Sequence, residues 1–220
     1  VRGEWTVLSR DDINSALAIS RGDGAGSIEV AQALGAALGG GELMQGLHVV
    51  GLEATGWLAG LFSTLSGEAK MEELPQPKLL KGELRPYQLR GVSWMSFLRR
   101  AGLAACLADD MGLGKTVQVI ALLLSEAERG MPIKPALIVC PTSVVGNWQR
   151  EITRFAPKLK VLVHHGSERM EGGQFAKSAA KNDVVLTTYA LLQRDIESLK
   201  QVRWAAAILD EAQNIKNSQA

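Results

Sequence analysis

The chain has 220 residues, of which 46% are hydrophobic and 21% are charged, values that are ordinary for a globular protein. Its net charge of +1 is unevenly distributed, because residues 1–75 carry a net −6 and residues 76–220 a net +7. A basic second part suits an anionic partner, although such charge is more often only a solvated surface. No apolar run is long enough to cross a bilayer, and the first residues lack the apolar stretch of a signal peptide.

The first 75 residues contain three apolar stretches with helical spacing, at 9–19, 27–38 and 52–67, separated by glycines. They show no constellation of chemically active side chains. We therefore expect residues 1–75 to form a small, mainly helical accessory segment. A protein partner is one candidate for what it contacts, and the sequence does not identify it. A proline-containing linker follows it.

Beyond residue 85 short apolar runs alternate with helical stretches, a pattern typical of a parallel sheet covered by helices on both faces. We expect strands at 103–108, 136–140, 160–164, 183–188 and 205–210. We expect helices at 85–100, 115–129, 143–155 and 188–199, and irregular structure at 166–174.

Two residue types that often mark a site give weak signals here. Cys106 and Cys140 lie in expected strands, so we interpret them as buried free thiols. His164 and His165 are adjacent, and neighbouring residues of a strand point to opposite faces, which argues against a shared metal ion.

Residues 107–116, LADDMGLGKT, end in Gly114, Lys115 and Thr116, as a phosphate-binding loop does. Asp109 stands where the general signature has glycine. An expected strand enters the loop and an expected helix leaves it, and this context makes the signal much stronger than the tripeptide alone. The alternative interpretation is an ordinary turn followed by a helix cap.

The loop residues have defined chemical tasks in such a site. Gly112 and Gly114 let the main chain bend and point its N–H groups at phosphate oxygens, next to the positive end of the helix dipole. Lys115 would reach the β- and γ-phosphates, and the Thr116 hydroxyl would bind Mg²⁺.

Asp210 ends the last expected strand and Glu211 follows it, where a parallel sheet would bring them to the same edge as the loop. Asp210 would hold Mg²⁺, and Glu211 would act as the base that orients and deprotonates the attacking water. The alternative is a surface acidic pair that caps the next turn.

Five segments resemble, in order and spacing, the first motifs of the Swi/Snf family of DNA-translocating ATPases, which belong to helicase superfamily two. They are LRPYQLRGVSWM (84–95), LADDMGLGKT (107–116), ALIVCPTSVVGNWQREITRFAP (136–157), DVVLTTYALL (183–192) and ILDEAQNIKN (208–217). In that family the loop is similar to D-x-M-G-L-G-K-T, so Asp109 and Met111 are expected. The D-E-A-Q form of the acidic segment resembles bacterial members, which implies a cytoplasmic, nucleoid-associated protein.

The resemblance implies a fold and a set of roles. Residues 76–220 would form the first RecA-like lobe, an α/β domain, and the second lobe would be absent from the sequence. Gln88 would read adenine and favour ATP over GTP, Lys115 and Glu211 would be catalytic, and Thr116 and Asp210 would bind Mg²⁺. The implied nucleotide-binding residues are Gln88, Asp110, Met111, Gly112, Leu113, Gly114, Lys115 and Thr116.

The resemblance also implies a partner, double-stranded DNA held by its phosphate backbone. Its implied contacts are Thr142, Ser143, Thr187, Thr188 and Tyr189. Trp148 is interpreted as core packing, and Gln213 as a link between the nucleotide site and neighbouring motifs.

The predicted function is the ATP-binding first motor lobe of a DNA-dependent ATPase that translocates on duplex DNA. Without the arginines of a second lobe, we expect these 220 residues alone to hydrolyse ATP little or not at all. Two alternatives stay open: a P-loop ATPase with no nucleic-acid partner, and a non-catalytic docking lobe.

Overall fold

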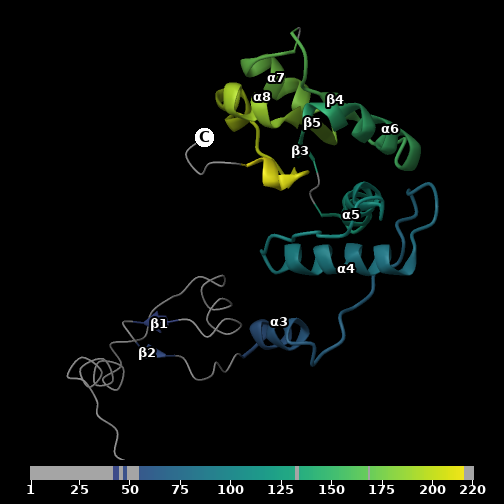
Figure 1. Ribbon diagram of the computed structural model, residues 1–220, viewed down its shortest axis with the longest axis vertical. Coiled ribbons are helices and arrows are strands. Elements are labelled where there is room, and N and C mark those ends of the chain that lie inside the picture. Colours follow the sequence, from purple (N-terminus) through teal and green to yellow (C-terminus); the bar gives the residue numbers. More distant parts are fainter. Residues whose placement is uncertain (1–41, 45–46, 49–54, 132–133, 168, 216–220) are drawn as a thin grey trace, which may run out of the picture. The chain divides into compact units, whose positions relative to one another are not determined.

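A computed structural model describes residues 42–44, 47–48, 55–131, 134–167 and 169–215 of the chain (Figure 1). The chain divides into two compact units, Val1–Lys70 and Met71–Ala220. This division falls a few residues before the boundary expected at the proline-containing linker. Within the described residues, no helix combines the length and the apolar character that crossing a membrane requires.

In the first unit the described elements are a short antiparallel pair and one helix. Strands β1 (Glu42–Met44) and β2 (Leu47–His48) pair with each other, and the sequence pattern did not predict them. Helix α3 (Trp57–Leu65) confirms the central part of the third expected helix. The helices expected at 9–19 and 27–38 lie outside the described residues.

The second unit contains a parallel sheet of four strands. They are β3 (Ala136–Cys140), β4 (Val161–Val163), β5 (Val184–Thr188) and β6 (Ala206–Leu209). Their order is β4-β5-β3-β6, and every neighbouring pair is parallel. Four of the five expected strands are thus confirmed, and so is the expected α/β class with a parallel sheet.

The helices of this unit are α4 (Pro86–Arg100), α5 (Lys115–Glu128), α6 (Val145–Phe155), α7 (Gly172–Ala179), α8 (Tyr189–Arg194) and α9 (Ile196–Lys200). Two 3₁₀ turns, η1 (Thr142–Val144) and η2 (Ala212–Asn214), follow β3 and β6. The helix expected at 188–199 is divided into α8 and α9 at Asp195. Helix α7 starts inside a segment that was expected to be irregular, at Gly172, whose φ is 54°.

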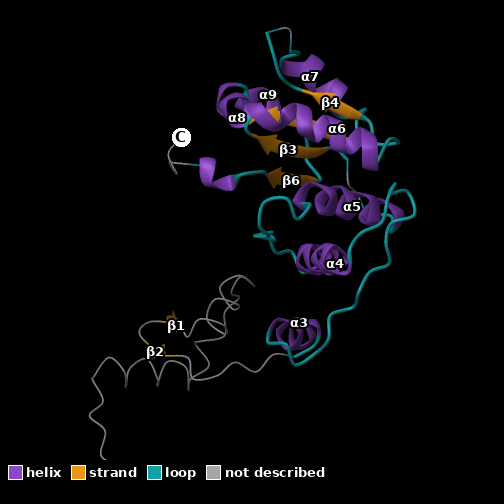
Figure 2. Cartoon of the chain, turned by 45° about the vertical axis from the view of Figure 1, so that its right-hand side comes forward, coloured by secondary structure: helices purple, strands orange, loops and turns teal. Residues whose placement is uncertain are grey.

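Alternate residues of the central strand face two separate cores, because successive side chains of a strand point to opposite faces. Ile138 of β3 packs in a core with residues of α4, α5 and α6. Leu137 and Val139 pack in the other core, with Phe175 of α7 and Leu199 of α9. Helices therefore cover both faces of the sheet, as expected (Figure 2).

The prediction of a strand at 103–108 is wrong. These residues connect α4 to the loop before α5 without pairing to any strand, and β6 is the outermost strand on its side of the described sheet. An apolar run adopts a strand only when a neighbouring strand offers hydrogen bonds, and 103–108 has none here. Leu107 still packs against the core, but Cys106 is exposed, so only Cys140 fits the expectation of a buried thiol.

Candidate active site

The loop between residues 109 and 114 has the backbone geometry that its glycines predicted. Gly112 and Gly114 have φ values of 83° and 81°, in the left-handed region that favours glycine. Gly114 is the N-cap of α5, and Lys115 is its first residue. A Cβ on Gly114 would lie 2.6 Å from the Gln88 amide nitrogen, so this position also lacks space for a side chain.

The Lys115 amine is bonded only to neutral groups. It donates to the carbonyl oxygens of Asp109 (2.7 Å) and Asp110 (3.1 Å), and no carboxylate among the described residues forms an ion pair with it. The main-chain N–H groups of Gly114 and Lys115 take part in no hydrogen bond of the described loop, as usual at a helix start. A cation and open N–H groups without a protein anion fit a phosphate group.

Asp109, which departs from the general loop signature, has a structural task. The buried Gln118 amide of α5 donates to the Asp109 carboxylate at 2.7 Å. A Cβ on Gly91 of α4 would lie 2.1 Å from the Gln118 side-chain oxygen. Asp109 therefore ties the start of the loop to α5, and the close approach of α4 holds Gln118 in place.

Gln88, the expected adenine reader, lies directly against the loop. Its side-chain oxygen accepts from the main-chain N–H of Arg85 at 2.9 Å, and its nitrogen donates to the Leu113 carbonyl at 3.0 Å. The Tyr87 hydroxyl donates to the same carbonyl at 3.0 Å. Both ends of the Gln88 amide are thus bonded to the protein, so its role in base recognition stays a prediction.

The acidic pair follows β6 and is fixed by aromatic donors. The Trp148 indole N–H donates to the Asp210 carboxylate at 2.8 Å, and the Tyr189 hydroxyl donates to the Asp210 carbonyl at 2.8 Å. Glu211 has a φ of 53°, unusual for a residue with a side chain, and its carboxylate accepts a short hydrogen bond from the Gln213 amide.

Two ionisable groups beside Asp210 keep their protons at neutral pH. Burial, reinforced by the Asp210 charge, raises the pKa of the Cys140 thiol to about 11. The same two causes, in the same order, raise the pKa of the Tyr189 hydroxyl. Cys140 is therefore not a nucleophile, and Tyr189 remains a hydrogen-bond donor.

The loop and the acidic pair lie on the same side of the domain. In Figure 2 the arrows of β3 and β6 point to the left-hand side. The loop before α5 lies on that side too, where the chain leaves β6. No ion pair joins Lys115 to Asp210, although both residues are described. The described residues also contain no group of three or more His, Cys, Asp or Glu side chains able to hold a metal by themselves.

The residues expected to contact DNA differ in exposure. Thr142 and Ser143, in η1, are exposed. Thr187 is 0% and Thr188 2% exposed, and the Thr188 hydroxyl accepts from the main-chain N–H of Leu191. The hydroxyls of Thr187 and Thr188 are therefore not presented to a ligand in this structure, because they face the interior at the end of a central strand.

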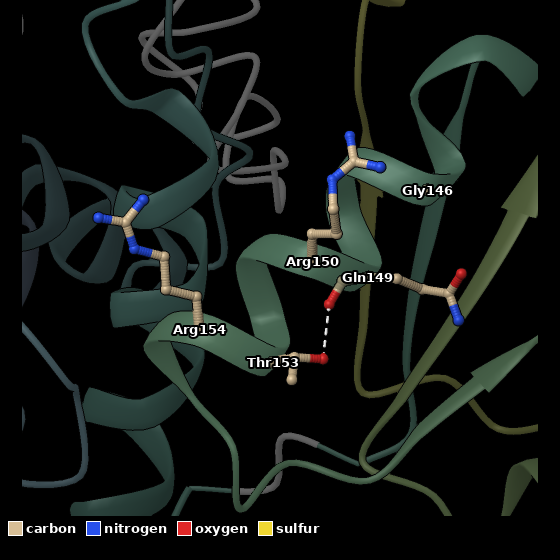
Figure 3. Close-up of a pocket in the computed structure, with 5 residues that line it drawn as sticks. All are labelled: Gly146, Gln149, Arg150, Thr153 and Arg154. Carbon is tan, nitrogen blue, oxygen red and sulfur yellow. Dashed lines mark hydrogen bonds between the residues drawn. The ribbon is translucent and has the colours of Figure 1, made fainter.

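A basic surface lies along α6, directly after η1, and sequence reasoning did not single it out. Gly146, Gln149, Arg150, Thr153 and Arg154 line an open hollow there (Figure 3). Arg150 and Arg154 are one helical turn apart, and neither forms an ion pair with a described residue. Arg150 donates only to the neutral Asn147 side chain, and Arg154 lies over the Phe155 ring. A helix face with two guanidinium groups that lack a protein carboxylate fits phosphate.

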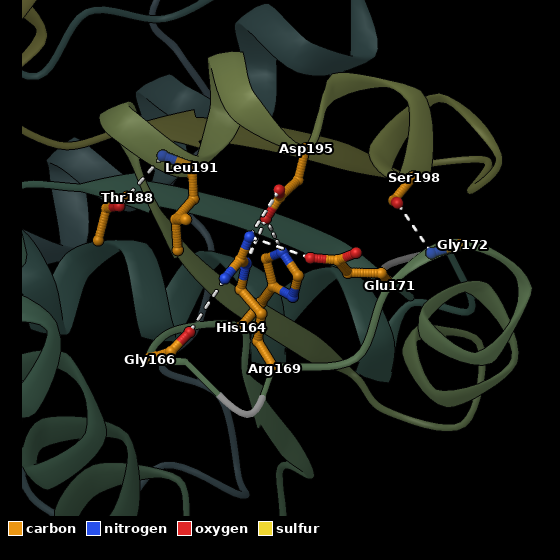
Figure 4. Close-up of polar contacts among 9 residues, drawn as sticks. All are labelled: His164, Gly166, Arg169, Glu171, Gly172, Thr188, Leu191, Asp195 and Ser198. Carbon is orange, nitrogen blue, oxygen red and sulfur yellow. Dashed lines mark hydrogen bonds and ion pairs between the residues drawn. The ribbon is translucent and has the colours of Figure 1, made fainter.

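A buried ion cluster joins the segment after β4 to Asp195, at the junction of α8 and α9 (Figure 4). Asp195 accepts from the His164 ring at 2.9 Å and from two nitrogens of Arg169, at 2.5 and 2.9 Å. Arg169 also donates to the Gly166 carbonyl and to Glu171. The cluster joins the segment after β4 to the junction of α8 and α9, and so fixes α8, which starts with Tyr189.

Comparisons with known proteins point to one family. Residues 87–220 match the SNF2-related domain family. A Bacillus subtilis protein named as a candidate ATP-dependent helicase/translocase, YwqA, is 53% identical over 150 residues, which cover 67% of this chain and 16% of that protein. The human chromatin-remodeling ATPase INO80 is 43% identical over 155 residues, covering 67% of this chain and 10% of that protein.

A solved structure, the Sulfolobus solfataricus SWI2/SNF2 ATPase core in complex with double-stranded DNA, is similar in fold. It is 44% identical, with a TM-score of 0.59, and the match covers 68% of this chain and 30% of that core. The chain thus spans less than a third of the length of each relative named here.

Proposed function

The chain belongs to the SNF2-related domain family, and on this basis we propose that it is the ATP-binding first RecA-like lobe of a DNA-dependent motor that translocates on duplex DNA. The observation that carries the proposal is the loop before α5. Its two glycines with left-handed backbone, its open N–H groups and a lysine that forms no ion pair with a carboxylate together fit a nucleoside triphosphate.

Each loop residue then has a defined task toward the nucleotide. When bound, Mg·ATP supplies the transferable phosphoryl group, with its charge partly offset by the metal. The Lys115 amine would exchange its two carbonyl partners for phosphate oxygens, while Thr116 and Asp210 would supply metal ligands. Glu211 would accept the proton of the attacking water, and its bond to Gln213 would hold the carboxylate until then.

The proposed second ligand is the phosphate backbone of double-stranded DNA. The exposed Thr142 and Ser143 can donate hydroxyl hydrogen bonds to phosphate, and Arg150 and Arg154 extend the same surface along α6. For the segment 187–189 the proposal narrows to Tyr189 and the neighbouring main chain, because both threonine hydroxyls are buried.

The nucleotide part of the proposal is tested by titrating the chain with a fluorescent ATP analogue. Replacing Lys115 with Ala removes the phosphate-binding cation, so we expect affinity to fall at least about tenfold, the size expected for a lost charge-assisted hydrogen bond. Lys177→Ala, on the exposed surface of α7, is the matched control. Equal affinity of the Lys115 variant and the wild type would favour the docking-lobe alternative.

The DNA part is tested by measuring duplex binding at several salt concentrations. Binding that weakens steeply with salt supports a backbone-tracking lobe, whereas absence of binding favours a P-loop ATPase without a nucleic-acid partner. We also expect ATP turnover by these 220 residues to stay close to background with or without DNA, because such motors use arginines from a second lobe. Strong DNA-stimulated turnover would contradict the two-lobe mechanism.

A further inference from the structure

Asp210 is the meeting point of two helices that each start at a segment expected to face DNA. Helix α6 follows η1, which carries the exposed Thr142 and Ser143. Helix α8 starts at Tyr189, directly after Thr188. One aromatic side chain of each helix donates a hydrogen bond to Asp210.

The bond from α6 goes to the carboxylate itself. Trp148 is 2% exposed, and its indole N–H lies 2.8 Å from Oδ2 of Asp210, which leaves Oδ1 free for another ligand. A core tryptophan needs only some acceptor for its N–H group, and a main-chain carbonyl is sufficient. Trp204 has such an acceptor, because its indole N–H donates to the Leu199 carbonyl at 3.0 Å. The Trp148 indole N–H donates instead to the Asp210 carboxylate, which we propose as a Mg²⁺ ligand.

The bond from α8 goes to the main chain at the same residue. The Tyr189 hydroxyl lies 2.8 Å from the Asp210 carbonyl oxygen, next to the peptide that leads into Glu211. Glu211 has a left-handed backbone, a conformation that persists only where the surroundings hold it. Tyr189 is one of the groups that hold it, and the Asp210 N–H, bonded to the Val139 carbonyl of β3, is another.

We infer that Trp148 and Tyr189 are positioning residues that couple DNA engagement to the metal-binding carboxylate. When phosphate binds at Thr142 and Ser143, α6 would move and carry the Trp148 indole N–H with it. Because that N–H is bonded to the Asp210 carboxylate, the carboxylate would turn and its Oδ1 would point in a new direction. Movement of α8 would shift the main chain between Asp210 and Glu211. This inference rests on the proposed function, since it assigns a regulatory link to the same site.

The test uses the complete protein and equilibrium binding rather than turnover alone. The Kd of a non-hydrolysable ATP analogue with Mg²⁺ is measured with and without saturating duplex DNA, and the ratio of the two values gives the coupling between the sites. Tyr189→Phe removes one donor and keeps the ring, whereas Trp148→Phe removes the indole N–H and replaces the indole with a smaller aromatic ring. Trp204→Phe removes an indole N–H bond to a carbonyl elsewhere in the domain and is the matched control.

In the wild type we expect DNA to tighten binding of the magnesium–nucleotide complex. Trp148→Phe should bring the ratio close to one and raise the Mg²⁺ concentration for half-saturation about tenfold, the size expected for one lost hydrogen bond to a charged group. Tyr189→Phe should lower the ratio with a smaller change in Mg²⁺ dependence, because its bond is to the main chain. Trp204→Phe should change neither. DNA affinity without nucleotide should stay within about twofold in Trp148→Phe and Trp204→Phe, since neither indole N–H is assigned to a DNA contact. The ratio for Tyr189→Phe is read at saturating DNA, because Tyr189 is itself a proposed DNA contact.

The outcomes separate the inference from the proposed function. A wild type that neither binds duplex DNA nor hydrolyses ATP in its presence would refute the function, and the inference with it. A wild type that is stimulated by DNA, with the same binding ratio in both variants as in wild type, would overturn the inference alone. If Trp148→Phe unfolds the domain, Tyr189→Phe decides, because it removes a single oxygen atom, and an unchanged ratio in that variant would also overturn the inference.

Discussion

Asp195 accepts hydrogen bonds from Arg169 and His164, two side chains from the segment after β4 (Figure 4). The bonds from the Arg169 guanidinium, aided by His164 and opposed by burial, lower the pKa of the Asp195 carboxyl to about 2. A carboxyl whose pKa is lower in the folded state than in the unfolded chain stabilises the fold above its unfolded pKa. That stabilisation is lost as pH falls from about 4 towards 2.

We therefore expect Asp195→Asn to be less stable than the wild type by about 2 kcal/mol at pH 6, with the difference shrinking as pH falls below 4. Urea unfolding at a series of pH values measures both quantities. Glu197→Gln, which removes an exposed carboxylate paired with Lys200 on α9, is the control and should shift stability by less than about 0.5 kcal/mol. A difference between Asp195→Asn and wild type that does not depend on pH would contradict the assignment.

The glycines of the loop offer a second prediction for single residues. Both Gly112 and Gly114 have positive φ, but only a Cβ at Gly114 would meet close neighbours, the Gln88 amide at 2.6 Å and Val117 at 3.1 Å. Gly112→Ala should therefore destabilise the fold by about 1 kcal/mol through the backbone alone, and Gly114→Ala by more. Adding Gln88→Ala should rescue part of the Gly114→Ala loss and none of the Gly112→Ala loss, as measured by denaturant unfolding.

Helices α4 and α5 form one support for the loop. Arg99 of α4 forms an ion pair with the buried Glu126 of α5 at 2.8 Å and also donates to the Ala205 carbonyl before β6. Elsewhere between the same two helices, Gly91 of α4 leaves room for Gln118 of α5, whose amide donates to the Asp109 carboxylate. The loop therefore inherits its position from the packing of two helices and not only from its own sequence.

This packing predicts the effect of adding one methyl group to α4. Gly91→Ala places a Cβ on the Gln118 side-chain oxygen, so we expect a loss of about 1 to 3 kcal/mol, as in other overpacked cores. Nucleotide affinity should fall too, because Gln118 can no longer hold Asp109. Gly146→Ala at the exposed start of α6 meets only ordinary contacts and should be neutral or slightly stabilising. A Gly91→Ala variant with wild-type stability and affinity would show that the helices adjust freely.

In the whole molecule, charge separates the two parts of the chain, with net −6 in residues 1–75 and +7 in residues 76–220. The guanidinium groups of Arg150 and Arg154, which form no ion pair with a described residue, place part of the positive charge beside the exposed η1 turn. Contacts to phosphates release counterions, so each contact contributes to the salt dependence of DNA binding.

We expect the double variant Arg150→Gln/Arg154→Gln to weaken duplex binding and to reduce the slope of log affinity against log salt by about two, one for each lost phosphate contact. Fluorescence anisotropy with duplexes of unrelated sequence measures the slope, and the loss should be similar for each sequence. Lys177→Gln together with Lys181→Gln, two exposed lysines at α7, is the charge-matched control. Equal slopes for the two double variants would show that Arg150 and Arg154 of α6 do not contact DNA.

Local patterns made most of the fold predictable. The helices at 86–100 and 115–128 and the four paired strands follow from apolar periodicity, because each buries a face that its own sequence defines. Periodicity failed at 103–108, since whether an apolar run becomes a strand depends on a neighbour elsewhere in the chain. It also missed α7, which starts among glycines that suggested a loop.

The sequence by itself determined the family, the parallel α/β architecture and the left-handed backbone at the loop glycines, because apolar periodicity and glycines at fixed spacing act through their own backbone. The roles of Lys115, Asp210 and Glu211 toward a nucleotide stay predictions. Only the tertiary structure decided that Thr187 and Thr188 are buried while Thr142 and Ser143 are exposed, and that Trp148 and Tyr189 both bond to Asp210. Such partnerships join residues that are far apart in the chain. They arise from the packing of helices against the sheet, which no local pattern encodes.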